Sequence, residues 1–317
     1  MSKNVLITGI TGFMGKFLTE EYLKDGFTVY GSTFDKTETP PKPRNALHLV
    51  PCDIRKKDEV RNLVANSNPD IVFHLAAQSN PVKSWNDPVY TMETNFNGTI
   101  NLFSELIDSK LDPKILVACS SAEYDYTAIK ENRPLNENDP LLPVHPYGLS
   151  KVCQDLISHQ YFENYGIKVI RARIFNTIGS GKKDDIIGDV SQQIAEIIRK
   201  REDPVVKVGN LDTERDMTDV RDQISALIAL VKTGKVGDVY NVCSGKSVQM
   251  RSLVKNMIEN SGKKIEIEID KSKLRVIDEP LIIGNHDKLS RDCSWEQRYD
   301  IDVTLKDSVN FWLEQMN

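Results

Sequence analysis

The sequence predicts an α/β protein with a doubly wound parallel sheet and a smaller C-terminal α/β part. Two observations lead to this fold class. Short apolar runs rich in β-branched residues alternate with stretches of helical periodicity, as in a parallel sheet that is covered on both faces. The first of these runs leads directly into three evenly spaced glycines, which commonly open a doubly wound sheet.

Composition is typical of a globular protein and argues against several partners. The 317 residues are 39% hydrophobic and 27% charged, enough for one large domain or two modest ones. The net charge is −5 without a basic cluster, so we expect no nucleic-acid partner. No apolar run reaches the length of a membrane span and Met1 leads straight into the first strand, so we expect no membrane partner. The five cysteines are scattered without a C-x-x-C pair, which favours reduced thiols in the cytoplasm and no metal site.

The stretch from Val5 to Gly15 reads V-L-I-T-G-I-T-G-F-M-G and predicts a phosphate-binding turn between a strand and a helix. The first glycine permits a tight turn, the second lets the backbone approach a pyrophosphate, and the third lets the helix pack on the strand. The helix N-terminus then directs free N–H groups at the phosphates. The alternative is a turn that binds nothing. The predicted cofactor contacts are Gly9, Thr11, Gly12, Phe13, Met14 and Gly15.

The end of the second predicted strand, 27–31, bears on the choice of cofactor. An acid at this position would bind the adenosine ribose of NAD, whereas a base would accommodate the extra phosphate of NADP. Here small hydroxyl residues precede Asp35 and Lys36, so NAD and NADP both stay open, and the hydroxyl residues favour NADP. Asp53 follows the third strand, where it would cap a helix over 55–64.

The next predicted strand, 71–75, reads I-V-F-H-L and runs into small residues, which would let a cofactor lie against the backbone. The expected contacts are Leu75, Ala76 and Ala77. His74 lies inside the apolar strand, so we interpret it as a core residue rather than a catalytic one. A helical pattern over 87–109 contains Asn95, which is either a bridge between backbone groups or a solvated side chain.

Hydroxyl, phenol and amine groups follow in an order that suits acid–base chemistry. Ser120, Ser121 and Glu123 come directly after a predicted strand, at the sheet edge where ligands bind. Tyr147 and Lys151 form a Y-x-x-x-K pair and share one face of the predicted helix. We expect the lysine to favour the phenolate and to lower the tyrosine pKa from about 10, which would give a general acid and base. Taken singly, such serines are ordinary loop residues and such a pair is an ordinary solvated helix face.

Seven motifs cover most of the chain: T-G-x-x-G-F-x-G, L-A-A-Q-S, T-N-F-N-G-T, C-S-S-A-E-Y, H-P-Y-G-L-S-K, F-N-T-I-G and R-D-M-T-D-V-R-D. Together they resemble the nucleotide-sugar branch of the extended short-chain dehydrogenase/reductase family. The chain looks most like the GDP-4-dehydro-6-deoxy-D-mannose reductases, because of P-x-x-P-Y-G-x-S-K, V-G-N-L and Y-N-V-C-S-G. The resemblance implies a Rossmann-like sheet and a homodimer formed through the helices at 87–109 and 147–165.

The resemblance also implies an activity, the reduction by NADPH or NADH of the C4 keto group of a GDP-4-keto-6-deoxyhexose in nucleotide-sugar biosynthesis. Tyr147 would protonate the developing oxyanion, which Ser120 or Ser121 would hydrogen-bond. Lys151 would also hold the nicotinamide ribose. The alternatives are a lyase of the GDP-mannose 4,6-dehydratase type, in which Glu123 would take part, a nucleotide-sugar 4-epimerase, and a cofactor-binding sensor without catalysis.

Further ligand contacts are implied by the same resemblance. Asp53 and Ile54 would contact the adenine. The expected contacts to the sugar nucleotide are Ser79, Asn176, Lys207, Asn210, Arg215 and Arg275. Arg215 and Arg275 are expected in loops, where a guanidinium fork suits a diphosphate, with plain surface arginines as the alternative. Val276 replaces the proline that the family usually has beside the second arginine.

We expect two domains. The dinucleotide-binding domain takes 1–174, with 219–245 returning to it, and the substrate-binding domain takes 175–218 and 246–317. The remaining strands are expected at 46–50, 114–119, 167–174, 205–208, 239–242 and 264–269. The remaining helices are expected at 147–165, 190–199, 219–232, 249–261 and 303–316.

Overall fold

The computed structural model describes residues 3–34, 41–125, 133–199, 203–274 and 278–316. Seven strands form the largest sheet: β1 (Asn4–Thr8), β2 (Thr28–Thr33), β3 (Leu47–Pro51), β4 (Ile71–His74), β5 (Lys114–Ser120), β6 (Val169–Ile174) and β10 (Val239–Val242). They pair in parallel in the order β10-β6-β5-β4-β1-β2-β3, which confirms the predicted doubly wound α/β fold. The strand order reverses between β1 and β4, and ligands bind at the carboxyl ends of the strands at such a point.

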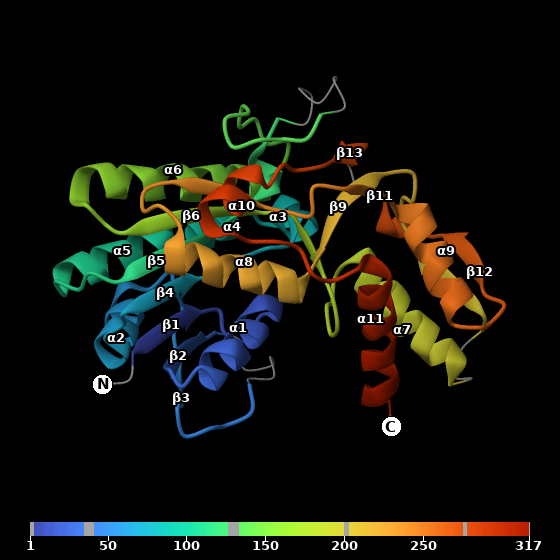
Figure 1. The fold of residues 1–317 in the computed structure, drawn as a ribbon, viewed down its shortest axis with the longest axis horizontal. Helices are drawn as coiled ribbons and strands as arrows, with labels where there is room; N and C mark the ends of the chain where they lie inside the picture. Colours follow the sequence, from blue (N-terminus) through green and yellow to red (C-terminus); the bar gives the residue numbers. More distant parts are fainter. Residues whose placement is uncertain (1–2, 35–40, 126–132, 200–202, 275–277, 317) are drawn as a thin grey trace.

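Helices cover both faces of this sheet (Figure 1). On one face lie α1 (Phe13–Lys24), α8 (Val220–Thr233) and α10 (Asp287–Cys293), and on the other α2 (Lys57–Ser67), α5 (Gly98–Asp108) and α6 (Pro146–Tyr165). Leu18 and Leu227 are buried in the first layer, and Leu63 and Phe103 in the second. Because helices cover both faces, the inner strands β1 and β4 are apolar over most of their length, in keeping with the pattern that the sequence shows.

The helix predicted over 87–109 is divided into three pieces. It begins as α4 (Pro88–Met92), widens into a π-helical turn, η1 (Glu93–Asn97), and continues as α5. A further short helix, α3 (Pro81–Asn86), precedes it. Asn95 lies in the π turn, a type of helix bulge that is frequent at functional sites.

A smaller part of the chain packs beside the carboxyl edge of the sheet (Figure 1). Its strands are β7 (Asn176–Ile178), β8 (Val205–Val208), β9 (Glu214–Asp219), β11 (Ser247–Gln249), β12 (Glu266–Ile269) and β13 (Leu281–Ile282). Its helices are α7 (Ile186–Ile198), α9 (Met250–Asn260) and α11 (Ile301–Gln315), with a short turn, η4 (Lys271–Lys273). Strand β9 pairs with β7, β11 and β13, and β8 pairs with β12. Val190, Leu253 and Leu305 are among the residues of its separate apolar core.

Several predicted boundaries are wrong in this smaller part. Arg215, predicted to lie in a loop, is part of strand β9, and the helix predicted to begin at 190 begins at Ile186. The partners of β9 are two- or three-residue strands, too short to show a periodicity in the sequence. Among the described residues, no helix combines the length and the apolar character that crossing a membrane requires.

Candidate active site

The glycine turn between β1 and α1 has the shape of a phosphate cradle. Gly9 adopts φ +71°, and a Cβ at this position would lie 3.0 Å from the Cα of Ala76. A Cβ at Gly15 would lie 2.6 Å from the carbonyl oxygen of Gly9, so α1 packs directly on the turn. Gly12 is the N-cap of α1 and has no side chain to cap its first amides. The turn therefore fits the pyrophosphate of a dinucleotide, with backbone N–H groups as donors.

The ends of β1, β2 and β4 are tied together around this turn. The Ser32 hydroxyl accepts a hydrogen bond of 2.8 Å from the Gly9 N–H, and Thr8 Oγ1 accepts from the amides of residues 75–76, both at 3.1 Å. The small hydroxyl residues at the end of β2, which favoured NADP, thus include one, Ser32, that supports the turn. Asp35 and Lys36 lie outside the described residues.

Asn95 bridges the loop after β4 to helix α6, which confirms the first of its two interpretations. Its Oδ1 accepts from the Gln78 N–H at 2.8 Å, and its Nδ2 donates to the Gln78 carbonyl at 3.0 Å and to Ser150 Oγ at 2.8 Å. Ser150 in turn donates to the Tyr147 carbonyl. The backbone against which a cofactor would lie is therefore connected to the helix that carries Tyr147 and Lys151.

At the other edge of the turn, Asp53 is held by Arg55. The Arg55 guanidinium donates to both Asp53 carboxylate oxygens at 2.9 and 2.7 Å, and these hydrogen bonds lower the pKa of Asp53. The same guanidinium lies 4.6 Å from the ring centre of Tyr90 and 5.7 Å from that of Phe34. A cavity of about 240 Å³ opens here, and Asp53, Arg55 and Glu93 are among its lining residues. An adenine contact by Asp53 and Ile54 stays a prediction.

Ser120, Tyr147 and Lys151 come together at the carboxyl end of β5. Ser120 is the last residue of β5, and its side chain hydrogen-bonds the Tyr147 phenol. The Lys151 ammonium lies 5.9 Å from the centre of the Tyr147 ring and donates to the carbonyl of Ala118 at 2.7 Å. A second hydrogen bond of 2.7 Å joins it to Gln154, a contact that the sequence argument missed. The signal for Gln154 was its position one helical turn after the lysine.

The acid–base properties of this trio differ from the expectation. Burial raises the pKa of Tyr147 to about 12, and the Ser120 hydrogen bond only partly opposes this effect. Burial lowers the pKa of Lys151 to about 8. The expectation that the lysine brings the tyrosine pKa below 10 is wrong for this structure, because burial of the phenol raises its pKa and the ammonium is held by Ala118 and Gln154 instead. The phenol is therefore protonated at neutral pH and can donate its proton.

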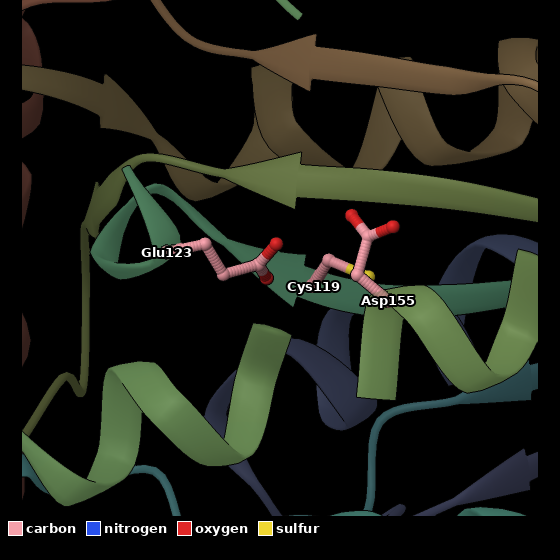
Figure 2. A group of neighbouring side chains, drawn as sticks. All are labelled: Cys119, Glu123 and Asp155. Carbon is pink, nitrogen blue, oxygen red and sulfur yellow. The ribbon is translucent and has the colours of Figure 1, made fainter. Parts of the chain in front are cut away.

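Glu123 belongs to a buried network behind Ser120. It ends a short turn, η2 (Ser121–Glu123), and its Oε1 accepts from the Ser120 N–H at 2.7 Å, while Oε2 lies 3.4 Å from Arg173 Nε. Figure 2 shows its side chain together with Cys119 and Asp155. Arg173 also pairs with Asp155 at 2.9 Å, so one guanidinium lies beside both acids.

We interpret the group in Figure 2 as an ion-pair network rather than a ligand set for a metal. Both oxygens of Asp155 are taken, one by Arg173 and the other by Arg171 at 2.7 Å. Burial and the Asp155 charge raise the pKa of Glu123, and burial raises that of Cys119. Glu123 is fully buried and held by the turn that it caps. Its position does not match that of a carboxylate directed at a substrate. Ser121, beside it, is also buried.

Arg215 is placed on strand β9 and not in a loop, and it is buried rather than a surface residue. Its guanidinium donates to Asp278 at 2.6 Å and to the Glu279 carbonyl at 2.5 Å. Asn210 donates to the other Asp278 oxygen at 3.0 Å, so the two predicted residues converge on one carboxylate. Sequence reasoning missed Asp278, although it lies only two residues after Val276, in the segment that resembles the family at Arg275.

The remaining predicted substrate contacts do not form one group with Arg215. Asn176 begins β7 and donates to the carbonyl of Asp216 at 3.2 Å, close to Arg215 along β9. Ser79 and Lys207 are exposed, and the Lys207 backbone is bound by Gln193. Arg275 lies outside the described residues.

Comparisons with known proteins agree with this geometry. The family model described as GDP-mannose 4,6 dehydratase matches residues 6–308. The GDP-6-deoxy-D-mannose reductase of Pseudomonas aeruginosa is 30% identical over 98% of each chain, and the GDP-6-deoxy-D-talose 4-dehydrogenase of Aggregatibacter actinomycetemcomitans is 28% identical over 90% of this chain and 89% of that one. The solved structure of RMD from Pseudomonas aeruginosa complexed with NADPH superposes with a TM-score of 0.84 at 28% identity, covering 99% of this chain and 100% of that one.

Proposed function

The chain belongs to the GDP-mannose 4,6-dehydratase family of NAD(P)-dependent nucleotide-sugar enzymes, and on this premise we propose that it reduces the C4 keto group of a GDP-4-keto-6-deoxyhexose. NADPH or NADH is the reductant, and the NADPH-bound relative favours NADPH. The similarity to a GDP-6-deoxy-D-mannose reductase over nearly the whole of both chains supports this substrate class.

The observation that carries the proposal is the protonated Tyr147 beside Ser120 and Lys151. Reduction of a ketone needs an acid that gives a proton to the oxygen as negative charge develops there. A phenol whose pKa is about 12 is in the required form at neutral pH.

The bound cofactor would supply the hydride, and the residues of the chain supply orientation and the proton. The backbone amides at Gly12–Gly15 would hold the pyrophosphate, and the small residues after β4 would receive the nicotinamide half. Tyr147 donates its proton to the C4 oxygen, while Ser120 hydrogen-bonds the same oxygen. Lys151 would hold the nicotinamide ribose, and its positive charge favours the phenolate that remains.

For the sugar nucleotide, Arg215 is the principal contact that we propose. A guanidinium fork matches two diphosphate oxygens, and burial strengthens the attraction because water does not screen it. Asp278 compensates the charge of Arg215 before the substrate binds. We assign Asn176 and Asn210 to the same ligand. We also propose more distant contacts to the sugar nucleotide by Ser79, Lys207 and Arg275.

The direct experiment follows NADPH oxidation after addition of GDP-4-keto-6-deoxymannose. We expect stoichiometric loss of absorbance by NADPH and a product heavier by two hydrogens. The competing lyase is tested by mixing the protein with GDP-mannose without added reductant. A species lighter by one water, formed by the unchanged protein and lost in Glu123→Gln, would replace the reductase assignment with a dehydratase.

We also propose a homodimer formed through α4 and α6, which pack against each other. Val89 on α4 is 66% exposed, and Leu149 and Leu156 on α6 are 50% and 53% exposed, an unusual set of apolar side chains for a free surface. Leu156→Asp should convert the dimer to a monomer in light scattering, and a monomeric unchanged protein would contradict the proposal. A reducing cytoplasm suits the five free cysteines.

A further inference from the structure

A chain of buried hydrogen bonds runs from the glycine turn to the catalytic lysine. Thr8 Oγ1 lies 2.8 Å from His74 Nδ1, and His74 Nε2 lies 2.9 Å from Thr99 Oγ1. Gln154 Nε2 donates to the same Thr99 oxygen at 2.8 Å. Gln154 Oε1 accepts from the Lys151 ammonium at 2.7 Å. All five side chains are buried, so the path is shielded from water.

The direction of every bond in this chain is fixed by the available donors and acceptors. Thr8 Oγ1 already accepts from the amides of residues 75–76, so its proton goes to His74 Nδ1. His74 is therefore the neutral tautomer with its proton on Nε2, which donates to Thr99. The Thr99 hydroxyl gives its own proton to the Asn95 carbonyl at 2.7 Å. Each donor and acceptor then has one role, so the protons of the chain have a single arrangement.

The two ends of the chain are the two halves of the proposed site. Thr8 directly precedes Gly9, and the backbone at residue 76 is the surface on which Gly9 packs. Lys151 is the group to which the proposed function gives the nicotinamide ribose. We propose that Gln154 is a positioning residue that holds the Lys151 ammonium in register with the glycine turn, an inference that rests on the proposed function for the role of Lys151.

A glutamine suits this position better than its close replacements. Its oxygen accepts from Lys151 while its amide nitrogen donates to Thr99, so one side chain closes the chain. Leucine has a similar size and would leave the ammonium with the Ala118 carbonyl alone. Glutamate would keep an acceptor for the lysine but has no donor for Thr99 when ionised.

The charged and titratable groups that face Lys151 explain why its hydrogen bond to Gln154 is important for the ammonium. Burial disfavours the ammonium, and the two acids that would favour it when ionised, Cys119 and Glu123, have raised pKa values themselves. The Tyr147 ring lies on one side. His74 stays neutral, since burial and the Lys151 charge lower its pKa to about 3. The ammonium is therefore held mainly by the dipoles of its two oxygen acceptors rather than by a carboxylate in direct contact.

The test measures NADPH binding by fluorescence across pH in the full-length protein. In the unchanged protein, affinity should fall with rising pH around pH 8, as Lys151 loses its proton. Gln154→Leu should weaken binding about 10-fold and move this midpoint to lower pH, because an acceptor for the charged form is lost. Gln154→Glu should move it to higher pH. Ser158→Ala is the control, since this buried hydroxyl on α6 donates to the backbone oxygen of Gln154 and not to its side chain.

A double-mutant cycle separates positioning from general packing. In a Lys151→Met background, Gln154→Leu should cause no further loss of NADPH affinity, because the residue through which it acts is gone. An additive 10-fold loss, or an unchanged midpoint in Gln154→Leu, would overturn the inference. These are binding measurements, so they stay informative if the protein binds NADPH yet fails to reduce the ketone, a result that would overturn only the proposed function.

Discussion

Two regions of the molecule are each proposed to hold a diphosphate, and they are built in opposite ways. The glycine turn on β1 relies on backbone amides and on glycines packed against backbone atoms. The segment around Arg215 on β9 relies on a buried guanidinium held by Asp278 and by two backbone carbonyls. Without its ligand, the turn has no charge to compensate, whereas Arg215 needs a counter-ion to remain buried.

The difference separates shape from charge as determinants of binding. A change in the turn acts through backbone geometry, so even one added methyl group should weaken binding of the dinucleotide there. A change at Arg215 acts through electrostatics, because it removes a buried cation and leaves the half-buried Asp278 without its guanidinium partner. Variants in the two regions should therefore affect different ligands.

Tyr147→Phe, between the two regions, should have the largest effect. Its phenol serves neither diphosphate, so the variant should bind NADPH and the sugar nucleotide normally. General acid catalysis is typically worth about 100- to 10,000-fold, and we expect a loss of this size in kcat. Steady-state kinetics together with binding titrations would measure both quantities. Turnover near that of the unchanged protein would remove Tyr147 from the mechanism.

Gly15→Ala should disrupt the glycine turn between β1 and α1. The new Cβ would lie 2.6 and 2.7 Å from two backbone oxygens, so α1 must shift away from the turn. Displacement of a binding group by about 1 Å can cost on the order of 100-fold, and we expect the NADPH dissociation constant to rise by this amount. Gly262→Ala is a matched control, since this glycine has φ +65° with open space around it. It should lose stability and keep its NADPH affinity, and equal losses in both variants would contradict a special role for Gly15.

Arg215→Ala should weaken binding of the sugar nucleotide around Arg215 and leave the glycine turn intact. Loss of hydrogen bonds to a charged ligand should raise KM for the sugar nucleotide about 10-fold, without a comparable change in NADPH affinity. Arg251→Ala is the control, because Arg251 pairs with Asp212 on the surface of the same part of the molecule. An unchanged KM in Arg215→Ala would show that the buried ion pair with Asp278 is structural.

The two regions also differ in how far the sequence predicts them. The doubly wound parallel sheet, the glycine turn, the core position of His74 and the bridge made by Asn95 follow from local patterns. Strand β9 was missed because its pairing partners are very short and remote in sequence. The spacing of Tyr147 and Lys151 predicts a shared helix face. It does not predict that the phenol is buried, which raises its pKa, or that Ala118 and Gln154 hold the lysine, so the predicted direction of the tyrosine pKa shift was wrong.

Substitution of Glu123 is expected to have the smallest effect, and it tests how this protein accommodates a buried acid. Unlike Asp278, which has a close guanidinium partner, Glu123 is fully buried near a second acid, Asp155. The Arg173 guanidinium is 3.4 Å from it, but burial and the Asp155 charge outweigh this attraction and raise the pKa of Glu123. Glu123→Gln keeps an oxygen for the Ser120 amide and resembles the protonated acid in shape and charge.

The sign of the pH effect follows from the raised pKa. Above the ordinary glutamate value of about 4.3, an unfolded chain ionises Glu123 while the folded chain retains its proton. The folded state then binds more protons than the unfolded state, so the contribution of Glu123 to stability falls as the pH rises toward its folded pKa. Because Gln cannot ionise, the melting temperature of Glu123→Gln should fall less between pH 5 and pH 8 than that of the unchanged protein. Glu163→Gln, an exposed change on α6, should leave the slope unchanged. Parallel curves for the unchanged protein and Glu123→Gln would mean that Arg173 keeps Glu123 ionised in the folded state.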